Sequence, residues 1–389
     1  MKANNGFVEQ SNLEKAVVLM RIILTGGGTG GHIYPALAVA EQLQQCHPEC
    51  EILYVGTDRG LEKEIVPKRN LPFCTIHAEG LPRKLTPALL KTMKKTAGGC
   101  LEARKIVKEF QPDVVIGTGG YVCGPVVLAA KLQGIPTMIH EQNAFPGITN
   151  KLLARFTDSI MVNFEESKKY FVHKERIAVT GLPVRQEVLS AEKSESLAYF
   201  GFSADKTTLL VSGGSRGARS LNRAMADAYP ELLKYPDLQI IHLTGKTDYE
   251  DTIAALNEKG IDIAEHPQVV IKSYLDEMQY GLRAADFCVG RAGATFLAEV
   301  TACGLPCILI PYPYAAENHQ EYNAKALVEQ NAASMILDKD LTGDVLCQSI
   351  LSLYQDSENR KQMAARSFAM GKRDALDEIV RLVEKQCAK

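Results

Sequence analysis

The sequence lacks a strong excess of either charge, which argues against a partner held by charge alone. Its 389 residues carry 44 Lys and Arg against 46 Asp and Glu, so the net charge is −2. With so small a net charge, no protein-wide field attracts nucleic acid, and electrostatic targeting must come from local patches. We therefore expect no nucleic-acid partner.

The sequence also lacks a long hydrophobic run, and its first residues lack the features of a signal peptide. No apolar stretch reaches the roughly 20 residues that a helix needs to span a bilayer. The first 14 residues are polar and lack the basic region and cleavage site of a signal peptide. Met20 is a plausible alternative start, so residues 1–19 are expected to be a loose N-terminal extension. Together with the cysteines in apolar runs, these features are typical of a cytosolic protein with reduced thiols.

Motifs typical of metal sites and of P-loop nucleoside triphosphatases are missing as well. Cys46 and Cys50 have no second ligand pair at zinc spacing. Residues 338–340 have the spacing of a metal-binding D-x-D, but they precede a helix in a polar turn, where aspartates commonly cap, so we interpret them as structural. Residues 245–247 lack the preceding glycine of a Walker A loop. We expect neither a metal nor a cofactor.

What the sequence does contain is one pattern repeated along the chain: a short apolar strand, a glycine cluster and an apolar helix. The four copies begin with strands at residues 21–24, 114–116, 209–211 and 287–289. Strands that alternate with helices predict parallel sheets covered on both faces, an α/β fold. The chain is also too long for one ordinary core, so two domains are expected.

The second and fourth copies match beyond their glycines. Asp113 and Asp286 each precede an apolar strand that ends in glycine, and a Gly-x-Pro triplet follows each helix. Chance similarity between common strand–helix–strand units is the alternative, but two domains of the same architecture explain the nearly constant spacing better. We place them at residues 20–183 and 184–372. Residues 373–389 form an amphipathic helix that could close the second domain or cross back to the first.

Glycine loops after the strands of a parallel sheet suit phosphate. They lie at the ligand-binding edge, allow close backbone approach, and lead into a helix start with unpaired N–H groups. Gly26, Gly28 and Gly31 also satisfy G-x-G-x-x-G, with Asp58 as a possible ribose acid, so a dinucleotide site is an alternative. Four loops over two similar halves fit a ligand held between two domains better than one cofactor in one domain.

Three polar residues near these loops are candidates for chemistry, each with a structural alternative. His32 follows the first loop directly and could be a general base or only a loop cap. Glu299, in the helix after the fourth loop, could accept hydrogen bonds from sugar hydroxyls or be a solvated helix residue. Arg185, beside the turn between the domains, could contact phosphate or form a surface ion pair.

One segment stands out for its local charge. Between residues 81 and 101 there are basic residues and no acid, and apolar residues interleave with them at helical spacing. A basic amphipathic helix can lie on an anionic membrane surface, although it could equally dock its apolar face on the protein. The candidate membrane residues are Arg83, Lys84, Leu85, Leu89, Lys91, Met93, Lys94 and Lys95.

Taken together, the motifs resemble the MurG family, the UDP-N-acetylglucosamine transferases that make lipid II for bacterial peptidoglycan. Any one loop is unspecific, but the ordered set is specific and covers residues 20–389. The motifs are residues 26–32 (GGGTGGH), 119–122 (GGYV), 140–143 (HEQN), 183–185 (PVR), 213–218 (GGSRGA), 291–295 (RAGAT) with Glu299, and 318–324 (NHQEYNA).

The resemblance implies a GT-B fold, in which two Rossmann-like domains face each other across a cleft. It also implies a set of binding residues for each substrate. His32 is the catalytic candidate. Residues implied to bind UDP-N-acetylglucosamine are Thr29, Gly30, Gly31, Asn143, Arg185, Ser215, Leu275, Ala294, Thr295, Phe296, Glu299 and Gln320. Gly28, Gly119, Gly120 and Tyr121 are assigned to the acceptor diphosphate.

The implied reaction is an inverting, metal-independent displacement. The 4-hydroxyl of undecaprenyl-diphospho-N-acetylmuramoyl-pentapeptide (lipid I) attacks the anomeric carbon of UDP-N-acetylglucosamine and releases UDP. The implied location is the cytoplasmic face of the cell membrane, on its anionic inner leaflet, with other wall-synthesis and division proteins as possible partners. Alternatives are another GT-B enzyme, such as a diacylglycerol glycosyltransferase or a UDP-N-acetylglucosamine 2-epimerase, and a nucleotide-binding scaffold in a wall-synthesis complex.

Overall fold

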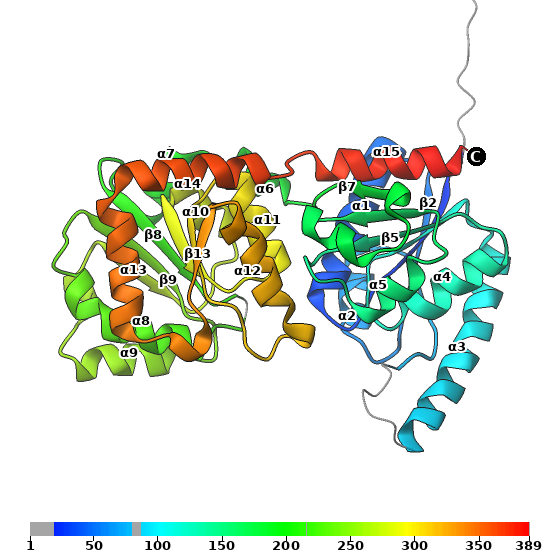
Figure 1. Cartoon of the computed structure of the whole chain (residues 1–389), viewed down its shortest axis with the longest axis horizontal. Helices are drawn as coiled ribbons and strands as arrows, with labels where there is room; N and C mark the ends of the chain where they lie inside the picture. The colour runs from blue at the N-terminus through cyan, green and yellow to red at the C-terminus, as the bar shows by residue number, and fades with distance from the viewer. Residues whose placement is uncertain (1–18, 80–86, 215, 389) are drawn as a thin grey trace, which may run out of the picture.

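A computed structural model describes residues 19–79, 87–214 and 216–388, with only the backbone described for residues 87–97. Two parallel sheets lie side by side along the long axis of the molecule, each covered by helices (Figure 1). The α/β fold with two Rossmann-like domains predicted from the glycine loops is confirmed. None of the helices in the described part of the chain is long and apolar enough to cross a bilayer.

The first sheet has seven strands in the order β3-β2-β1-β4-β5-β6-β7, all paired in parallel. Its strands are β1 (Arg21–Thr25), β2 (Glu51–Gly56), β3 (Phe73–Thr75), β4 (Val114–Gly117), β5 (Thr137–Glu141), β6 (Ser159–Val162) and β7 (Ile177–Val179). Side chains alternate between the faces of a strand, so Ile22 and Leu24 enter one core and Ile23 the other. Burial on both faces explains why β1 is a continuous apolar run.

The second sheet has six strands in the order β10-β9-β8-β11-β12-β13, again all parallel. Its strands are β8 (Thr207–Ser212), β9 (Leu238–Leu243), β10 (Val269–Lys272), β11 (Phe287–Gly290), β12 (Cys307–Leu309) and β13 (Ala333–Met335). Counted from its own first strand, each sheet has the doubly wound order in which ligands bind where the order reverses. That point lies between β1 and β4 in one domain and between β8 and β11 in the other.

Helices cover both faces of each sheet. In the first domain, α1 and α15 pack in the core on one face of the sheet, and α3 and α4 pack in the core on the other face. In the second domain, α8 and α13 pack on one face, and α10, α11 and α12 pack on the other. The helices are α1 (Gly30–Cys46), α2 (Glu62–Ile65), α3 (Pro87–Phe110), α4 (Cys123–Leu132), α5 (Ile148–Leu153), α6 (Gln186–Ser190), α7 (Lys193–Phe200), α8 (Arg219–Leu232), α9 (Tyr249–Glu258), α10 (Met278–Ala284), α11 (Ala294–Cys303), α12 (His319–Glu329), α13 (Gly343–Gln355), α14 (Ser357–Met370) and α15 (Ala375–Cys387).

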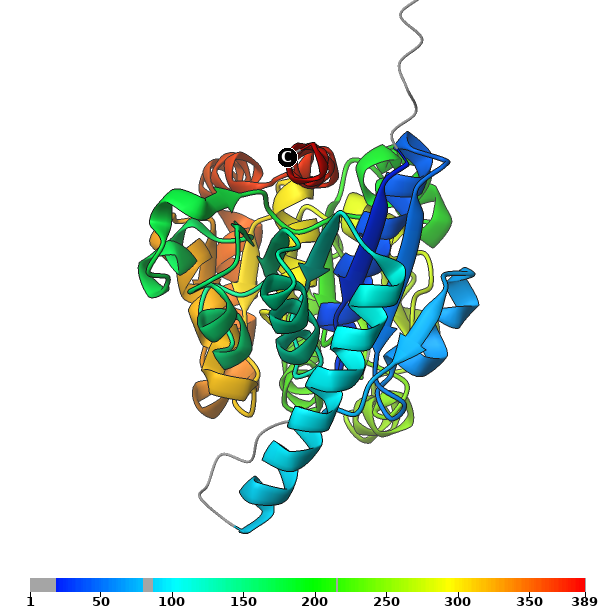
Figure 2. The same cartoon turned by 90° about the vertical axis from the view of Figure 1, so that its right-hand side faces the viewer.

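The predicted membrane segment is described only in part. Its first residues, Arg83, Lys84 and Leu85, lie outside the described residues. The rest belongs to α3, which extends beyond the body of the first domain (Figure 2). Only the backbone is described at Leu89, Lys91, Met93, Lys94 and Lys95.

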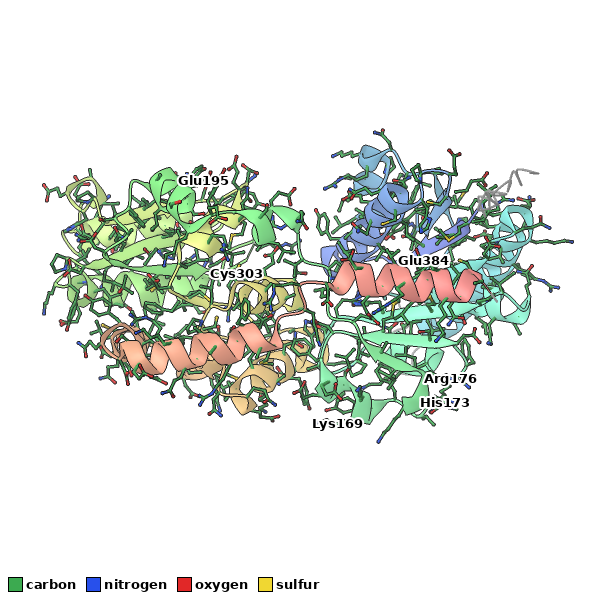
Figure 3. All side chains as sticks on the ribbon, turned by 90° about the horizontal axis from the view of Figure 1, so that it is seen from above. Lys169, His173, Arg176, Glu195, Cys303 and Glu384 are labelled. Atoms are coloured by element: carbon green, nitrogen blue, oxygen red, sulfur yellow. The ribbon has the colours of Figure 1, made fainter. Side chains whose placement is uncertain are left out.

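The last helix belongs to the first domain by its contacts, although the second domain precedes it in the chain. Ile379, Val380 and Val383 are buried in the core that contains β1 and α1. Polar contacts flank this interface: Gln42 Nε2 donates to Asp377 Oδ1 at 3.1 Å, and Glu384 pairs with His47 at 2.7 Å. Seen from above, α14 lies on the second domain and α15 on the first (Figure 3). The chain therefore crosses between the domains twice, near Gly181 and near Lys372.

Candidate active site

The first two glycine loops of the first domain pack against each other. Gly27 N donates to Gly119 O at 3.2 Å, and Tyr54 Oη donates to Gly26 O at 2.8 Å. A Cβ atom on Gly26 would lie 2.1 Å from Thr118 Oγ1, and one on Gly120 would lie 2.3 Å from Gly27 O. Glycine is required at both positions, because the Thr118 hydroxyl lies against Gly26 and the backbone of Gly27 lies against Gly120.

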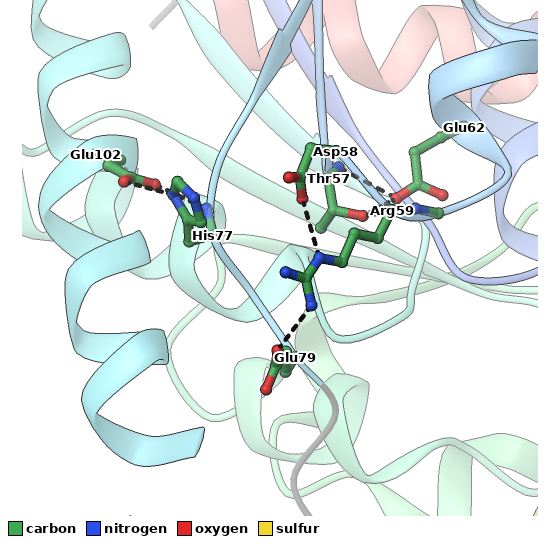
Figure 4. A network of polar contacts seen from close by, with 8 residues as sticks. Thr57, Asp58, Arg59, Glu62, His77, Glu79 and Glu102 are labelled. Atoms are coloured by element: carbon green, nitrogen blue, oxygen red, sulfur yellow. Dashed lines mark hydrogen bonds and ion pairs between the residues drawn. The ribbon is translucent and has the colours of Figure 1, made fainter. Parts of the chain in front are cut away.

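The buried carboxylate of Glu62 forms a hydrogen bond with the backbone of the first glycine loop. Its Oε2 accepts a hydrogen bond from Gly28 N at 3.1 Å, and its Oε1 accepts from Thr57 N at 3.1 Å and Thr57 Oγ1 at 2.7 Å (Figure 4). Asp58, the possible ribose acid of a dinucleotide site, lies near Arg59 instead, 4.0 Å from its Nε. The Gly28 N–H is thus used within the protein, where it bonds the buried Glu62 side chain.

The residues assigned to the acceptor diphosphate come together at this junction. Gly28, Gly119 and Gly120 have φ angles of 83°, 112° and 87°. A Cβ atom on Gly28 would lie 3.3 Å from the Tyr121 ring. Thr29 is the N-cap of α1 and, like Gly31, is exposed, whereas Gly30 is half-buried. The structure places these residues along one edge of the first sheet, beside His32.

His32 is half-buried, and both its side chain and its carbonyl contact neighbouring loops. Its Nδ1 lies 3.2 Å from Gln142 Oε1, and its carbonyl accepts from Thr118 Oγ1 at 2.7 Å. Burial lowers the pKa of the imidazole, an effect that the Glu141 carboxylate opposes. The side chain is therefore neutral near neutral pH and able to accept a proton.

Asn143 is positioned by a second buried carboxylate and faces the other domain. Glu141 Oε1 accepts from Asn143 N at 2.9 Å and Asn143 Nδ2 at 3.2 Å. Asn143 Oδ1 accepts from Asn323 Nδ2 at 3.2 Å, and Asn323 Oδ1 accepts from Ala144 N at 2.8 Å. Phe145 stacks on Tyr322, with ring centroids 4.7 Å apart. These contacts bring the loop after β5 against α12.

In the second domain, the start of α11 is open to a ligand. Its N-cap, Gly293, has extended backbone angles and no side chain to accept a hydrogen bond from the first turn. The N–H groups at Ala294, Thr295 and Phe296 therefore have no partner from the cap. Such a helix start favours an anion through its N–H groups and its dipole.

Arg185 and Glu299 form one ion pair. Arg185 Nε donates to Glu299 Oε1 at 2.7 Å; the arginine side chain is 47% exposed and the glutamate 6%. Burial raises the pKa of Glu299, and Arg185 opposes the rise. The sequence assigned these residues to separate parts of the donor, and the structure shows that they are direct neighbours.

The remaining donor candidates differ in accessibility. Gln320 Oε1 accepts from Tyr312 N at 2.9 Å, which leaves the side-chain NH₂ of this half-buried residue for a ligand. Leu275 is buried, at 5% exposure, so its side chain belongs mainly to the core. Ser215 lies outside the described residues.

Arg291, which the sequence gave no role, holds several donor-side loops together. Its Nη1 lies 2.5 Å from Asp338 Oδ1 and donates to Ile310 O at 3.1 Å, while Nη2 donates to Ser220 Oγ at 2.9 Å. Asp338 also accepts from Ser220 Oγ at 2.7 Å. The 338–340 turn is expected from the sequence to cap the helix that follows it, but the N-cap of α13 is Thr342, and Asp338 is held by Arg291 and Ser220 instead.

A cavity of about 240 Å³ also lies between the domains. It is lined by Leu297, Ala298 and Thr301 of α11 and by Glu165 and Lys372 among others. With 3.6 residues per turn, Leu297 and Thr301 lie on the opposite side of α11 from Glu299, and Ala298 lies on its flank. No glycine-loop residue in the described part of the chain lines the cavity.

Comparison with known proteins gives matches along nearly the whole chain. Residues 22–162 match the glycosyltransferase family 28 N-terminal domain, and residues 208–379 match its C-terminal domain. A protein of Desulforamulus reducens is 53% identical over 366 residues, which cover 94% of this chain and 98% of the relative. It is named UDP-N-acetylglucosamine--N-acetylmuramyl-(pentapeptide) pyrophosphoryl-undecaprenol N-acetylglucosamine transferase.

Solved structures agree with this match. The crystal structure of Acinetobacter baumannii MurG superposes with a TM-score of 0.76 at 29% identity, covering 94% of this chain and 99% of that one. A UDP-GlcNAc 2-epimerase from Neisseria meningitidis, bound to UDP-GlcNAc, superposes with a TM-score of 0.67 at 15% identity, covering 94% of this chain and 100% of that one. The second likeness shows a shared fold alone.

Proposed function

The chain belongs to the MurG family within glycosyltransferase family 28, and we propose that it transfers N-acetylglucosamine from UDP-N-acetylglucosamine to the 4-hydroxyl of lipid I, giving lipid II for peptidoglycan. The observation that carries this proposal is the 53% identity over 94% of the chain to a relative named for that transfer. The two-domain geometry supports it, because each domain supplies a different part of the chemistry.

The second domain is proposed to bind the donor. The open start of α11 at residues 294–296 and the half-exposed Arg185 provide N–H groups and a positive charge for the diphosphate. Glu299 lies in the next turn of α11, where a carboxylate can accept hydrogen bonds from the ribose hydroxyls. Gln320, with its free NH₂ group, is assigned to the sugar. Leu275 and Ser215 remain candidates for the uracil and the diphosphate.

The first domain is proposed to supply the base and hold the acceptor. His32 takes the proton of the acceptor 4-hydroxyl as that oxygen attacks C1 of N-acetylglucosamine. The bond between C1 and the UDP oxygen breaks, and its electron pair leaves with UDP. Preorganised N–H groups and Arg185 stabilise the charge that develops there. Thr29, Gly30, Gly31 and Asn143 lie beside His32, and the Gly28, Gly119, Gly120 and Tyr121 junction is assigned to the acceptor diphosphate.

We place the enzyme on the anionic cytoplasmic face of the membrane, with the first domain toward the lipid. Beyond the basic segment at residues 83–95, large apolar side chains are exposed on α3, α4 and α5, and α4 packs against the other two helices. These side chains are Leu101, Leu132, Ile148 and Leu152, which are 50–77% exposed. Arg104 is exposed on α3, and Arg155 is exposed in the turn just after α5. An apolar patch with basic residues suits an anionic lipid surface. Other wall-synthesis and division proteins are proposed partners.

A single assay separates this function from its alternatives. Labelled UDP-N-acetylglucosamine is incubated with the enzyme and a lipid I analogue, and the products are separated by chromatography. The proposal predicts a lipid-linked disaccharide and UDP. Release of free N-acetylmannosamine would indicate the epimerase, glucosylated diacylglycerol in a parallel reaction would indicate the lipid glycosyltransferase, and binding without turnover would indicate a scaffold.

A further inference from the structure

A chain of hydrogen bonds runs from His32 into the interior of the first domain through Gln142. Gln142 is 2% exposed, and its side-chain Oε1 lies 3.2 Å from His32 Nδ1. On its other side, Gln142 Nε2 lies 3.2 Å from His140 Nδ1. The sequence motif at residues 140–143 gave a role to Asn143 alone, so Gln142 is unassigned.

The neighbours of Gln142 fix which way its amide points. Its Nε2 donates to Thr118 O at 2.7 Å and to His140 O at 3.1 Å. Both partners are backbone carbonyls, which only accept hydrogen bonds, so the NH₂ group must face them. The amide oxygen must therefore face His32. A flipped amide would place its oxygen against both carbonyl oxygens and lose both hydrogen bonds.

His140 fixes the amide from the far side. His140 Nε2 lies 2.8 Å from Gly181 O, so this nitrogen carries the proton and donates it to the carbonyl. His140 Nδ1 is then an acceptor that shares one of the two Gln142 N–H groups with a carbonyl. Burial lowers the pKa of His140 to about 4, which keeps the ring neutral and this arrangement intact near neutral pH.

An amide oxygen accepts hydrogen bonds and never donates, so His32 Nδ1 must carry the proton that joins the two residues. We propose that Gln142 is a positioning residue that holds His32 in the tautomer protonated at Nδ1, leaving the lone pair of Nε2 for the acceptor hydroxyl. This inference rests on the proposed role of His32 as the base. To that role the inference adds the tautomer of His32, the ring nitrogen that takes the proton, and Gln142 as the residue that selects both.

Gln142 also leaves His32 without a charged partner at Nδ1. Four groups act on the His32 ring besides burial, which lowers its pKa. Glu141 on β5, the Gln142 side chain and the Thr118 backbone raise the pKa, and His319 on α12 lowers it. A carboxylate in place of Gln142 would stabilise the imidazolium and raise the pKa of His32. The neutral amide raises the pKa of His32 through its hydrogen bond alone and adds no opposite charge, so the base stays unprotonated to a lower pH than it would beside a carboxylate at this position.

The direct test is nuclear magnetic resonance of the full-length enzyme with isotope-labelled histidine nitrogens. The His32 signals are assigned by comparison with His32→Ala. The proposal predicts a protonated Nδ1 and an unprotonated Nε2 in the wild type, and a mixture of both tautomers in Gln142→Met. A wild-type His32 protonated at Nε2 would overturn the proposal, and so would a Gln142→Met spectrum with unchanged tautomer. Neither readout depends on turnover.

Kinetics give a second readout. Gln142→Met is expected to lower kcat about tenfold, with the Kd for UDP-N-acetylglucosamine within about twofold of wild type. Gln142→Glu is expected to move the acid limb of the kcat profile to higher pH. Gln239→Met is the matched control, because Gln239 is a buried amide of the second domain that bonds Ser203 and Thr208 and should leave kcat and its pH profile unchanged.

The outcomes distinguish the positioning role of Gln142 from the role of His32 as the base. An unshifted acid limb in folded Gln142→Glu would count against the positioning role. If His32→Ala turned over normally, the base assignment would fail, while the tautomer selected by Gln142 would still be decided by the spectra. Thermal unfolding of each variant shows whether a lost rate reflects the site or the fold.

Discussion

Glu299 illustrates how a single residue can serve binding at a cost in stability. It is a buried carboxylate, and burial raises its pKa despite the neighbouring Arg185. An acid whose pKa is higher in the folded than in the unfolded protein favours folding most at low pH, below its unfolded pKa. That contribution is lost as the pH rises through the raised value, so at neutral pH the ionised group lowers the free energy of unfolding.

We therefore predict that Glu299→Gln unfolds at the same or a higher temperature than wild type near neutral pH. The difference should shrink as the pH falls below the ordinary range of a glutamate, because the wild-type carboxyl is then protonated. Thermal unfolding at a series of pH values measures this. A clearly lower Tm for Glu299→Gln at neutral pH would mean that the ion pair with Arg185 outweighs the cost of burial.

Glu62 is predicted to matter for stability more than for chemistry. In Glu62→Gln, an NH₂ group would face either the Gly28 N–H or the Thr57 N–H, leaving a buried donor without an acceptor. We expect a loss of about 1–3 kcal/mol in the free energy of unfolding, measured by chemical denaturation. Glu102→Gln is the matched control, since Glu102 also accepts from a backbone N–H, that of His77, but is 40% exposed. Equal effects of the two substitutions would contradict this account.

The role of a site residue could be predicted where a sequence motif contains it, and not where the role depends on contacts formed only in the folded interior. His32, Arg185 and Glu299 follow glycine or turn motifs, and the spacing of loops after parallel strands places such residues at one edge of a sheet. Glu62, Arg291 and the Gln142 amide act through hydrogen bonds to loops distant in the chain. Gln142 and Arg291 stand in motifs that gave them no role, and Glu62 stands in none, so only the folded contacts reveal what these side chains do.

Among the elements, α3 contains two adjacent glycines with different surroundings. A Cβ atom on Gly99 would lie 2.1 Å from His77 O, whereas one on Gly98 meets no atom within 4 Å. Close packing of the segment after β3 against the helix explains Gly99. Nothing in the structure explains Gly98.

Opposite effects are predicted for the two alanine substitutions. Gly98→Ala should raise the free energy of unfolding by about 1 kcal/mol, because alanine is the better helix former. Gly99→Ala should lower it, because the new methyl group forces α3 away from His77. Denaturant titration of both variants gives the signs. A change of the same sign in the free energy of unfolding of both variants would contradict the close packing of Gly99 against His77 and the open surroundings of Gly98.

At the scale of elements, the strands could be read from the sequence and the place of α15 could not. A continuous apolar run followed by glycine is sufficient to predict a buried parallel strand such as β1 or β8. The apolar stripe of α15 shows only that one side of the helix is buried, and it fits either domain equally well. Its contacts with α1 depend on the path of the chain after α14, which no local pattern encodes.

The whole molecule joins its domains through a small set of contacts next to the site. Asn323 is fully buried, and it bonds Asn143 and Ala144 of the first domain as well as Ala292 O of its own domain at 3.1 Å. Together with the stacked Phe145 and Tyr322, it aligns the loop after β5 with α12. The relative position of His32 and the donor-binding residues is set by this interface.

The central claim is that the first domain supplies the base and the second binds the donor. The most direct measurement compares His32→Ala with Glu299→Gln, using calorimetry for the Kd of UDP-N-acetylglucosamine and saturating substrates for kcat. We predict that His32→Ala lowers kcat by about 10²-fold or more with nearly unchanged Kd, and that Glu299→Gln weakens binding about tenfold with nearly unchanged kcat. A His32→Ala enzyme that keeps its kcat but loses donor affinity would contradict the account.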